Sequence, residues 1–538
     1  MKTRLSPVFL FLLFAAPVHA QTNPSPSCES LAQLKLPQAK ILAAEIVPAG
    51  AFKSPVPPPP WMVGIEQLYK SLPAFCRVAV QATPSSDSDI RIEVWLPAEN
   101  WNGKLQVHGN GGFAGEADLP HLATSILSGY AAASTDTGHT GTAVDAHWAL
   151  GHPEKVTDFG HRAIHVTTVL AKEITRARFG KDARYSYFLG CSNGGRQALM
   201  EAQRYPGDFN GILAGAPANY WSHLLTSGLW DMQALLAEDA SYIPANKLPA
   251  IAHAVNAACD AQDGVTDGIL NDPRKCAFKP ESMLCKNGDA ADCLTQPQIA
   301  ALKKIYEGPH NAAGKIFPGF LPGAEEGPGG WSTWIVGAAP GKSLIAAFTY
   351  GYYANIVYEK PDWSFKSADL PESVKLADEK TSKILNATDP DLAPFKSNGG
   401  KLILYHGWND PAISALNTID YWEAVRARLG AAPTDSFARL YMLPGVQHCS
   451  GGVGPDLTSS LDGPGPRDAQ HNVVTALETW VEKGTAPSAI IATKYVSDDP
   501  AKGAKLSRPI CPYPQVAKYK GSGDPNDAAN FSCAADPK

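Results

Sequence analysis

The chain has 538 residues, of which 44% are hydrophobic and 18% charged, and its length predicts one large domain with an insertion or several domains. Lys and Arg number 46 against 52 Asp and Glu, giving a formal charge of -6. This balance indicates neither nucleic acid nor an anionic membrane as a partner.

Residues 1–20 are typical of a secretory signal peptide. Lys2 and Arg4 precede an apolar run from Val8 to Ala16, and the run is followed by the small residues of a cleavage site ending at Ala20. The apolar run is too short to span a bilayer. We therefore expect a secreted or periplasmic protein.

Residues 21–88 are expected to be a largely irregular segment. The proline-rich run at 55–61 favours an extended connector and cannot lie inside a helix. The first clear strand is expected at 90–96, where Ile90, Ile92, Val94 and Leu96 alternate with other residues. This alternation is typical of an edge strand or a half-exposed strand.

A short strand at 104–107 leads directly into the glycine-rich segment 108–115, which reads HGNGGFAG. In α/β-hydrolases the loop after the third strand supplies one oxyanion N–H, often from an HGGG-type sequence. The segment matches this pattern with one Asn inserted. Gly111 and Gly112 are therefore candidate oxyanion donors, and the alternative is a glycine-rich turn without a catalytic role.

Residues 190–195 read GCSNGG and fit the G-x-S-x-G nucleophile elbow. A strand is expected at 185–189 and a helix at 196–205, and the small Gly190 and Gly194 relieve crowding around Ser192. The Asn193 amide is the first N–H offered to an oxyanion at the helix start. The motif alone is equally compatible with a glycine-rich turn that merely positions a serine.

The elements around this motif alternate between strand and helix. A buried strand is expected at 130–134 and a helix at 158–179, ahead of the elbow strand, which is typical of a parallel α/β sheet. Residues 219–388 then contain helices and many Gly and Pro turns, which predicts an inserted lid. The core is expected to comprise residues 21–218 and 389–538.

The lid contains two aromatic stretches, which include Trp331, Trp334 and residues 348–353. Aromatic side chains at this density can line a pocket for a ring-bearing substrate, although an ordinary lid core explains them equally well.

Strands are expected again at 401–405 and 438–443, and Asp410 and His448 follow their carboxyl ends. The order Ser192, Asp410, His448 is that of the α/β-hydrolases. His448 would take the serine proton, and Asp410 would orient the imidazole. His406 is the rival base, and it becomes a pocket-wall residue if His448 is the base.

The mature chain carries ten cysteines, an even number that predicts disulfides in an exported protein. The two cysteines beside Ser192 and His448 would, if paired, hold that histidine next to the serine, and for this reason we prefer His448 to His406. The connectivity is a hypothesis at this level. The suggested pairs are Cys28–Cys76, Cys191–Cys449, Cys259–Cys276, Cys285–Cys293 and Cys511–Cys533.

A cluster of carboxylates at Asp260, Asp263 and Asp267 predicts a calcium site. Carboxylates this close repel one another unless a cation joins them, and Ca²⁺ accepts carboxylate and carbonyl oxygens. A Cys259–Cys276 bridge closing the loop favours the metal. The spacing is not that of an EF-hand, and solvated Asp-Gly turns are the alternative.

Taken together, the GCSNGG segment, Asp410 within HGWND, the His448-Cys449 pair and the acidic loop resemble the tannase and feruloyl esterase family, which includes mono(hydroxyethyl) terephthalate hydrolase. The resemblance implies an α/β-hydrolase fold with an inserted lid domain, a Cys191–Cys449 disulfide and structural calcium. Matched by position, the calcium ligands are the side chains of Asp260, Asp263 and Asp267 and the carbonyls of Val265 and Ile269.

The resemblance also implies ester hydrolysis on aromatic acids. We expect a serine esterase that cleaves small hydroxycinnamic or gallic esters, free or attached to plant polysaccharide, through an acyl-enzyme. Feruloyl esterase activity is the first expectation, with tannase or mono(hydroxyethyl) terephthalate hydrolase activity as alternatives. A non-catalytic polyphenol- or carbohydrate-binding protein and a peptidase are the competing classes. The candidate pocket residues are His406, Trp221, Ile413, Trp331 and Trp334.

Overall fold

The computed structural model describes residue 1 and residues 26–55, 64–327, 329–456 and 466–535. The predicted signal peptide, apart from Met1, and the proline run beyond Pro55 lie outside the described residues. In the part of the chain that is described, no helix is both long enough and apolar enough to cross a membrane.

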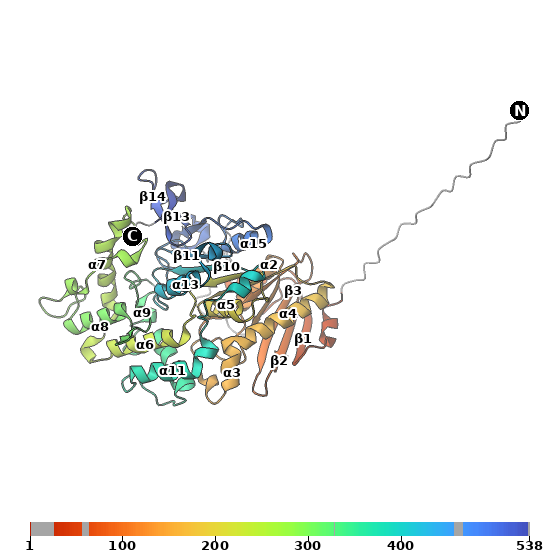
Figure 1. Ribbon diagram of the computed structural model, residues 1–538, viewed down its shortest axis with the longest axis horizontal. Helices are drawn as coiled ribbons and strands as arrows, with labels where there is room; N and C mark the ends of the chain where they lie inside the picture. Colours follow the sequence, from red (N-terminus) through yellow and green to blue (C-terminus); the bar gives the residue numbers. More distant parts are fainter. Residues whose placement is uncertain (2–25, 56–63, 328, 457–465, 536–538) are drawn as a thin grey trace.

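A nine-stranded sheet forms the centre of the molecule (Figure 1). The pairs β1/β2, β2/β3 and β3/β5 are antiparallel, and every later neighbouring pair is parallel. In spatial order the strands are β1 (Ala39–Val47), β2 (Phe75–Ala82), β3 (Ile90–Pro97), β5 (Ala131–Thr135), β4 (Lys104–His108), β6 (Tyr185–Cys191), β7 (Gly211–Gly215), β10 (Lys401–Gly407) and β11 (Ala438–Leu443).

The N-terminal part of this sheet corrects two expectations. Residues 21–88 are not largely irregular, because β1 and β2 lie within them on either side of the proline run. As a result β3 is an interior strand between β2 and β5 rather than an edge strand. Proline disfavours a strand or helix only at its own position. The segments on either side keep enough apolar residues to form paired strands, as the alternating burial along β2 shows.

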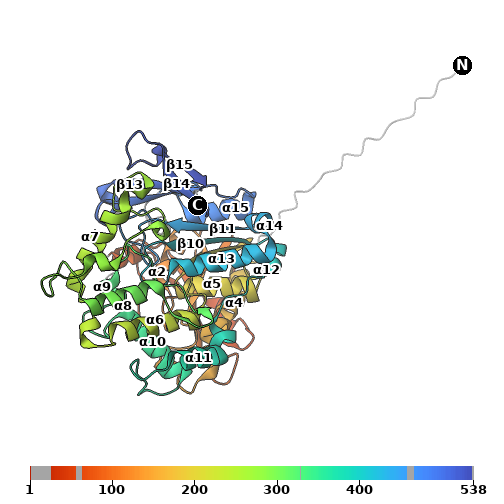
Figure 2. The ribbon, with the colours of Figure 1, turned by 60° about the vertical axis from the view of Figure 1, so that its left-hand side comes forward.

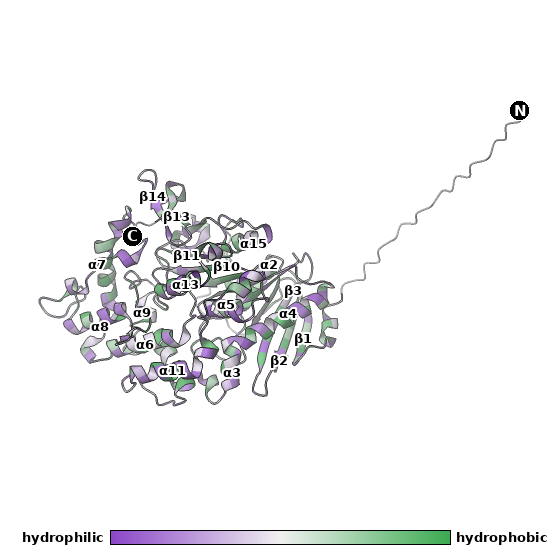
Figure 3. Ribbon diagram, viewed as in Figure 1, coloured by the Kyte–Doolittle hydropathy of each residue, from purple (hydrophilic) through white to green (hydrophobic). Residues whose placement is uncertain are grey.

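Helices pack on the sheet and bury their apolar sides against it. A π-helical turn, Asp158–Arg162, leads into α4, which places Ala163, Leu170 and Ile174 in the core and is followed by the C-cap residue Gly180. Figure 3 shows hydrophobic residues along the central strands and more hydrophilic ones on outer helices. The helices are α1 (Ile65–Lys70), α2 (Leu119–Leu127), α3 (Pro153–Thr157), α4 (Ala163–Phe179), α5 (Asn193–Arg204), α12 (Ala393–Ser397), α13 (Ala415–Leu429), α14 (Ala431–Asp435) and α15 (Val473–Lys483).

The chain between β7 and β10 forms the inserted lid, which lies at the opposite end of the molecule from β1 to β3 (Figure 1). Figure 2 shows the green part of the lid to the left of β10 and β11. One apolar cluster, which includes Met232, Ile251 and Trp331, belongs to the lid, and a second joins lid residues to Phe113 and Ile413 of the core. The lid helices are α6 (Trp221–Leu235), α7 (Leu248–Cys259), α8 (Gln296–Glu307), α9 (Trp331–Trp334), α10 (Leu344–Gly351) and α11 (Leu370–Leu385), with a small hairpin of β8 (His310–Asn311) and β9 (Gly314–Lys315).

The C-terminal residues add two small antiparallel pairs that the sequence did not predict. They are β12 (Ile490–Tyr495) with β13 (Ala504–Ile510), and β14 (Gln515–Tyr519) with β15 (Phe531–Ala535). This region contacts the lid, because Arg508 pairs with Asp267 at 2.7 Å and Asn271 donates to the Ala517 carbonyl.

Five disulfides cross-link the chain, and among the described residues no cysteine is free. Their pairing is the one suggested from the sequence: Cys28–Cys76, Cys191–Cys449, Cys259–Cys276, Cys285–Cys293 and Cys511–Cys533.

Candidate active site

Ser192 stands at the turn between β6 and α5, with φ 64° and ψ -123°. A non-glycine residue with positive φ is strained, so the surrounding structure must hold it there. Glycines make room for the turn. A Cβ on Gly190 would lie 2.5 Å from the carbonyl oxygen of Gly194, and a Cβ on Gly195 would overlap the carbonyl of Gly215. The sequence therefore builds a sharp elbow that exposes one hydroxyl.

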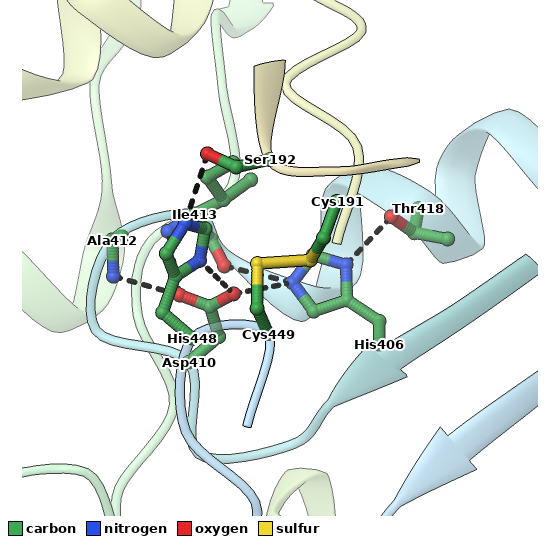
Figure 4. Close-up of a disulfide and its surroundings, with 9 residues drawn as sticks. All are labelled: Cys191, Ser192, His406, Asp410, Ala412, Ile413, Thr418, His448 and Cys449. Atoms are coloured by element: carbon green, nitrogen blue, oxygen red, sulfur yellow. Dashed lines mark hydrogen bonds and ion pairs between the residues drawn. A yellow bond between two sulfur atoms is a disulfide. The ribbon is translucent and has the colours of Figure 1, made fainter. Parts of the chain in front are cut away.

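Three side chains form a hydrogen-bonded chain at the carboxyl edge of the sheet (Figure 4). Nε2 of His448 lies 2.9 Å from Oγ of Ser192, and Nδ1 of the same ring lies 2.8 Å from Oδ2 of Asp410. Asp410 follows β10 and His448 follows the neighbouring β11, so parallel pairing of these strands brings their ends together. Such a chain can move a proton from the hydroxyl to the imidazole.

The Asp410 carboxylate is fixed at both oxygens. Oδ1 accepts the backbone N–H groups of Ala412 at 2.8 Å and Ile413 at 2.9 Å, while Oδ2 faces His448 and His406. Burial alone would raise the pKa of this carboxyl. The charge and hydrogen bonds of the two histidines outweigh that effect and hold its pKa well below the usual range. The group is therefore a fixed anion.

His406 is not a pocket-wall residue, and that prediction is wrong. Its side chain is 0% exposed and has buried partners at both ring nitrogens. Nδ1 lies 2.7 Å from Oγ1 of Thr418, and Nε2 lies 3.1 Å from both Asp410 and the carbonyl oxygen of Ile413. Because Nε2 faces two acceptors, it must carry a proton. The ring braces Asp410 and does not reach Ser192.

The Cys191–Cys449 disulfide joins the residue before Ser192 to the residue after His448 (Figure 4). Cys449 also has a positive φ of 64°. The bridge thus links two strained turns that lie 258 residues apart in the chain. Because it joins the main chain next to both residues, the bridge holds the Ser192 turn and the His448 turn together.

Arg196 stabilises the turn at Ser192, a role that the sequence did not predict. Its guanidinium is fully buried and donates to Oδ1 of Asn193 at 2.8 Å and to the carbonyls of Gly160, Phe159 and Leu385. It also lies over the ring of Trp221, 5.2 Å from its centre. Burial, followed by repulsion from Arg204, lowers the pKa of Arg196 to about 9. This one side chain ties the elbow helix to the lid.

The predicted oxyanion donors lie in two segments. Asn193 begins α5 directly after Ser192, and Gly112 lines the cavity that contains Ser192. Gly112 has φ 54°, and a Cβ there would overlap the carbonyl of Ala143, so glycine is required. Gly111 is exposed beside it.

The loop that carries Gly112 is braced against the elbow helix. Gln197 of α5 accepts the backbone N–H of Asn110 through Oε1 at 3.0 Å, and its amide nitrogen donates to Oδ1 of Asn110 at 3.3 Å. The Asn110 side chain also donates to two backbone carbonyls, each at 2.7 Å. The Asn inserted into the glycine run therefore holds the two oxyanion segments together.

A cavity of about 60 Å³ opens over Ser192 and His448. The Trp334 ring meets the His448 ring edge to face at 5.0 Å and lies 6.1 Å from the ring of Phe348. Trp221, Trp334 and Ile413 line the cavity, as the sequence predicts for pocket residues. The remaining lining residues are Gly112, Ala218, Leu224, Leu225, Ile345, Phe348 and Ala412.

Trp331 does not line this cavity, and its prediction as a pocket residue is wrong. It is 0% exposed and packs in the lid core, with its ring 5.7 Å from that of Tyr306. Trp331 and Trp334 begin and end the same short helix, and only the second reaches the site. Leu224, Leu225 and Ile345 carried no signal in the sequence that distinguishes them from ordinary lid-core residues.

A larger cavity of about 370 Å³ lies beside the Cys191–Cys449 disulfide. Its lining includes both cysteines together with His108, His121 and Arg467, but not Ser192 or His448. Size does not decide which cavity is the reaction site. We assign chemistry to the smaller one because it contains the serine and the base.

The acidic loop of the lid holds its three carboxylates in turns closed by the Cys259–Cys276 disulfide. Asp260 accepts the N–H of Gly268, and Asp263 accepts that of Val265, both at 3.0 Å. Burial, together with the charges of Asp267 and Asp260, raises the pKa of Asp263 to about 6. Arg508 neutralises one of the three carboxylates by pairing with Asp267. Two negative charges remain, but the three carboxylates do not all lie within 4.8 Å of one another in the described structure.

The sheet order, the serine at a strand-to-helix elbow and the acid and base after the parallel strands β10 and β11 define an α/β-hydrolase. The family model for tannase and feruloyl esterase matches residues 76–534. The chain belongs to this family, and it is a carboxylic ester hydrolase.

Individual relatives agree with this assignment. The chain is 40% identical to an uncharacterized esterase of Xanthomonas campestris pv. campestris, over 96% of this chain and 92% of that protein. It is 33% identical to the mono(2-hydroxyethyl) terephthalate hydrolase of Piscinibacter sakaiensis, over 87% and 86%. The crystal structure of feruloyl esterase B from Aspergillus oryzae superposes with a TM-score of 0.85 at 28% identity, over 94% and 99%.

Proposed function

We propose that this protein is an exported serine esterase that hydrolyses hydroxycinnamic esters of the feruloyl type through an acyl-enzyme. The observation that carries the proposal is the unbroken chain from Ser192 through His448 to Asp410, with distances of 2.9 and 2.8 Å. Export is supported by the predicted signal peptide and by five disulfides, which persist in oxidising compartments.

In the proposed mechanism, Nε2 of His448 takes the proton of Ser192 as Oγ attacks the ester carbonyl. The oxyanion accepts N–H groups of Asn193 and Gly112. The imidazolium, stabilised by Asp410, then gives its proton to the leaving alcohol oxygen and leaves an acyl-enzyme. In the second half, His448 takes a proton from water while the water oxygen attacks the acyl carbonyl. The imidazolium then gives that proton to Oγ of Ser192 as the bond to the acyl group breaks and the acid leaves.

The lining of the reaction cavity supports a hydroxycinnamoyl group over the alternatives. Trp221, Trp334 and Phe348 offer aromatic faces to a substrate ring. Apart from Ser192 and His448, the described lining residues have no hydroxyl, amide or charged side chain. This lining suits a feruloyl ring with one hydroxyl better than gallate with three, and the free carboxylate of a terephthalate monoester would lack a cation.

We also propose that the acidic loop holds one structural Ca²⁺. Asp260, Asp263 and Asp267 would bind it through side chains, and Val265 and Ile269 through main-chain carbonyls. When bound, the ion neutralises the loop and stabilises the folded lid. It has no part in the ester chemistry, because the loop belongs to the lid and none of its residues lines the cavity of Ser192.

The test is hydrolysis of methyl ferulate, chlorogenate, methyl gallate and mono(2-hydroxyethyl) terephthalate by the mature protein. We expect the two hydroxycinnamoyl esters to give the highest kcat/KM. Ser192→Ala should abolish turnover of all four, whereas Ser436→Ala, at an exposed serine of the same core, should change nothing.

Other outcomes would overturn the proposal. A preference for methyl gallate or the terephthalate monoester would reassign the substrate class while keeping the mechanism. Ester turnover that survives in Ser192→Ala would refute the serine mechanism. Binding of ferulate esters by the unmodified protein without any turnover would favour a non-catalytic binding protein, and cleavage of peptides alone would favour a peptidase.

A further inference from the structure

A second cluster of metal-ligating side chains lies at the far end of the elbow helix. It consists of His165 on α4, Glu201 on the last turn of α5 and Asp208 in the loop before β7. One donor atom from each residue lies within 4.8 Å of the other two. In the described parts of the chain, this is the one group of three His, Cys, Asp or Glu residues that meets this distance.

Glu201 distinguishes the cluster from a surface group of charges. The residue is 1% exposed, and its Oε2 has no hydrogen-bond partner among the residues that the structure describes. A buried carboxylate oxygen without a partner costs free energy, so it is found where a ligand or a proton satisfies it.

The other two ligands are preorganised at a half-exposed rim. Nδ1 of His165 lies 2.6 Å from Oδ2 of Asp208, and the imidazole stacks on the Tyr205 ring at 3.9 Å. The Lys172 ammonium donates to the main-chain oxygen of Asp208. This contact is to a carbonyl and not to a carboxylate, so it leaves Oε2 of Glu201 without a partner.

We propose that His165, Glu201 and Asp208 bind a divalent first-row transition metal, with Zn²⁺ as the expected ion. An imidazole nitrogen with two carboxylates is a donor set that suits Zn²⁺, which these ligands approach to about 2.0–2.2 Å. Water from the half-exposed side completes the coordination. The hard cation Ca²⁺ prefers oxygen ligands and would not use His165, so this site is separate from the acidic loop of the lid.

The metal joins three segments behind the catalytic turn. α5 begins beside Ser192 and ends at Arg204, so an ion at Glu201 anchors the distal end of the helix whose first turn supplies Asn193. Binding is therefore expected to raise the thermal stability of the core. It is not expected to be required for ester hydrolysis, because the cluster lies outside the reaction cavity.

The experiment is a titration of the folded mature protein with Co²⁺, followed by its visible absorption, in the presence of excess Ca²⁺. We expect saturable binding that Zn²⁺ displaces, and a rise in Tm with Zn²⁺. Glu201→Gln and His165→Gln should each weaken binding by more than the roughly 10–100-fold that loss of an outer partner costs, and should abolish the Tm shift.

His147→Gln is the matched control, because His147 forms a similar pair with Asp145 at 2.8 Å without a third carboxylate in the group. This variant should bind Co²⁺ as the unmodified protein does. If Glu201→Gln does not fold, His165→Gln at the rim decides the question alone. No Co²⁺ binding by the unmodified protein, or equal binding by His165→Gln, would overturn the site and leave a shared proton between the two carboxyl groups.

Discussion

Replacing Asp410 by asparagine tests whether this residue orients His448, and the geometry determines which way the new amide must point. The backbone N–H groups of Ala412 and Ile413 both point at Oδ1, so the oxygen of an asparagine side chain must remain there. Its NH₂ group then takes the place of Oδ2 and faces His448 and His406. The amide donates to Nδ1 of His448 and forces that ring to carry its proton on Nε2, toward Ser192, where it cannot accept the hydroxyl proton.

The expected loss follows from this reversal of the His448 tautomer. In serine proteases the same exchange lowers kcat by roughly 10⁴, which corresponds to about 5 kcal/mol of transition-state stabilisation. We expect a comparable fall in kcat on methyl ferulate with little change in KM, because the substituted side chain does not line the cavity. Asp420→Asn, at an exposed aspartate paired with Lys315, is the control and should retain full activity.

A fall of less than tenfold in kcat for Asp410→Asn, or an effect confined to KM, would refute the reasoning. Either result would mean that His448 reaches the productive tautomer without Asp410, or that another group acts as the base. Circular dichroism must show the same fold in both variants at the assay temperature.

Three further predictions concern the bridge, a buried acid and the acidic loop. Replacing Cys191 and Cys449 together by serine should lower the free energy of unfolding by up to about 5 kcal/mol. We expect kcat to fall at least tenfold while circular dichroism still reports a folded core. Full activity in this variant would contradict the role assigned to the bridge. Burial raises the pKa of Asp136 to about 7 from 3.8, so ionisation destabilises the native state progressively from about pH 4 to pH 7, by at most about 4 kcal/mol. Asp136→Asn should therefore raise Tm at pH 8 and leave it unchanged at pH 4, and equal shifts at both would refute the assignment. Chelation of Ca²⁺ should lower Tm of the unmodified protein but not of Asp263→Asn. If Tm does not shift and elemental analysis finds no calcium, the proposed calcium site is refuted.

Much of the core could be predicted from the sequence because local pattern and strand-end chemistry agree there. The segments that lead to Asp410 and His448 are short apolar runs, and β11 occupies the predicted residues 438–443. β7 escaped prediction because Gly211–Gly215 has five small or aliphatic residues and no alternation. Its strand character comes from pairing with β6 and β10 on either side, which is tertiary information.

The site shows where sequence reasoning ends. His406 lies near the end of β10 and His448 follows β11, and the sequence cannot tell that the His406 ring points into the interior toward Thr418. Trp331 and Trp334 are equally plausible pocket residues until packing places one in the lid core. The support from Arg196 depends on three carbonyls from distant segments, which no local pattern in the chain encodes.

The position of the lid has a consequence for how such enzymes diversify. The insertion leaves the sheet after β7, and its two ends meet, because the backbone N–H of Ala387 donates to the carbonyl oxygen of Asn219 at 2.7 Å. Any segment that folds by itself and keeps its ends that close can therefore replace it without disturbing the sheet. Ser192, Asp410 and His448 lie outside the exchanged segment, whereas Trp221, Trp334 and Phe348 lie within it. Grafting a lid from a relative that keeps the contacts of Arg196 with the lid is thus a route to new ester specificity with the same three reacting groups.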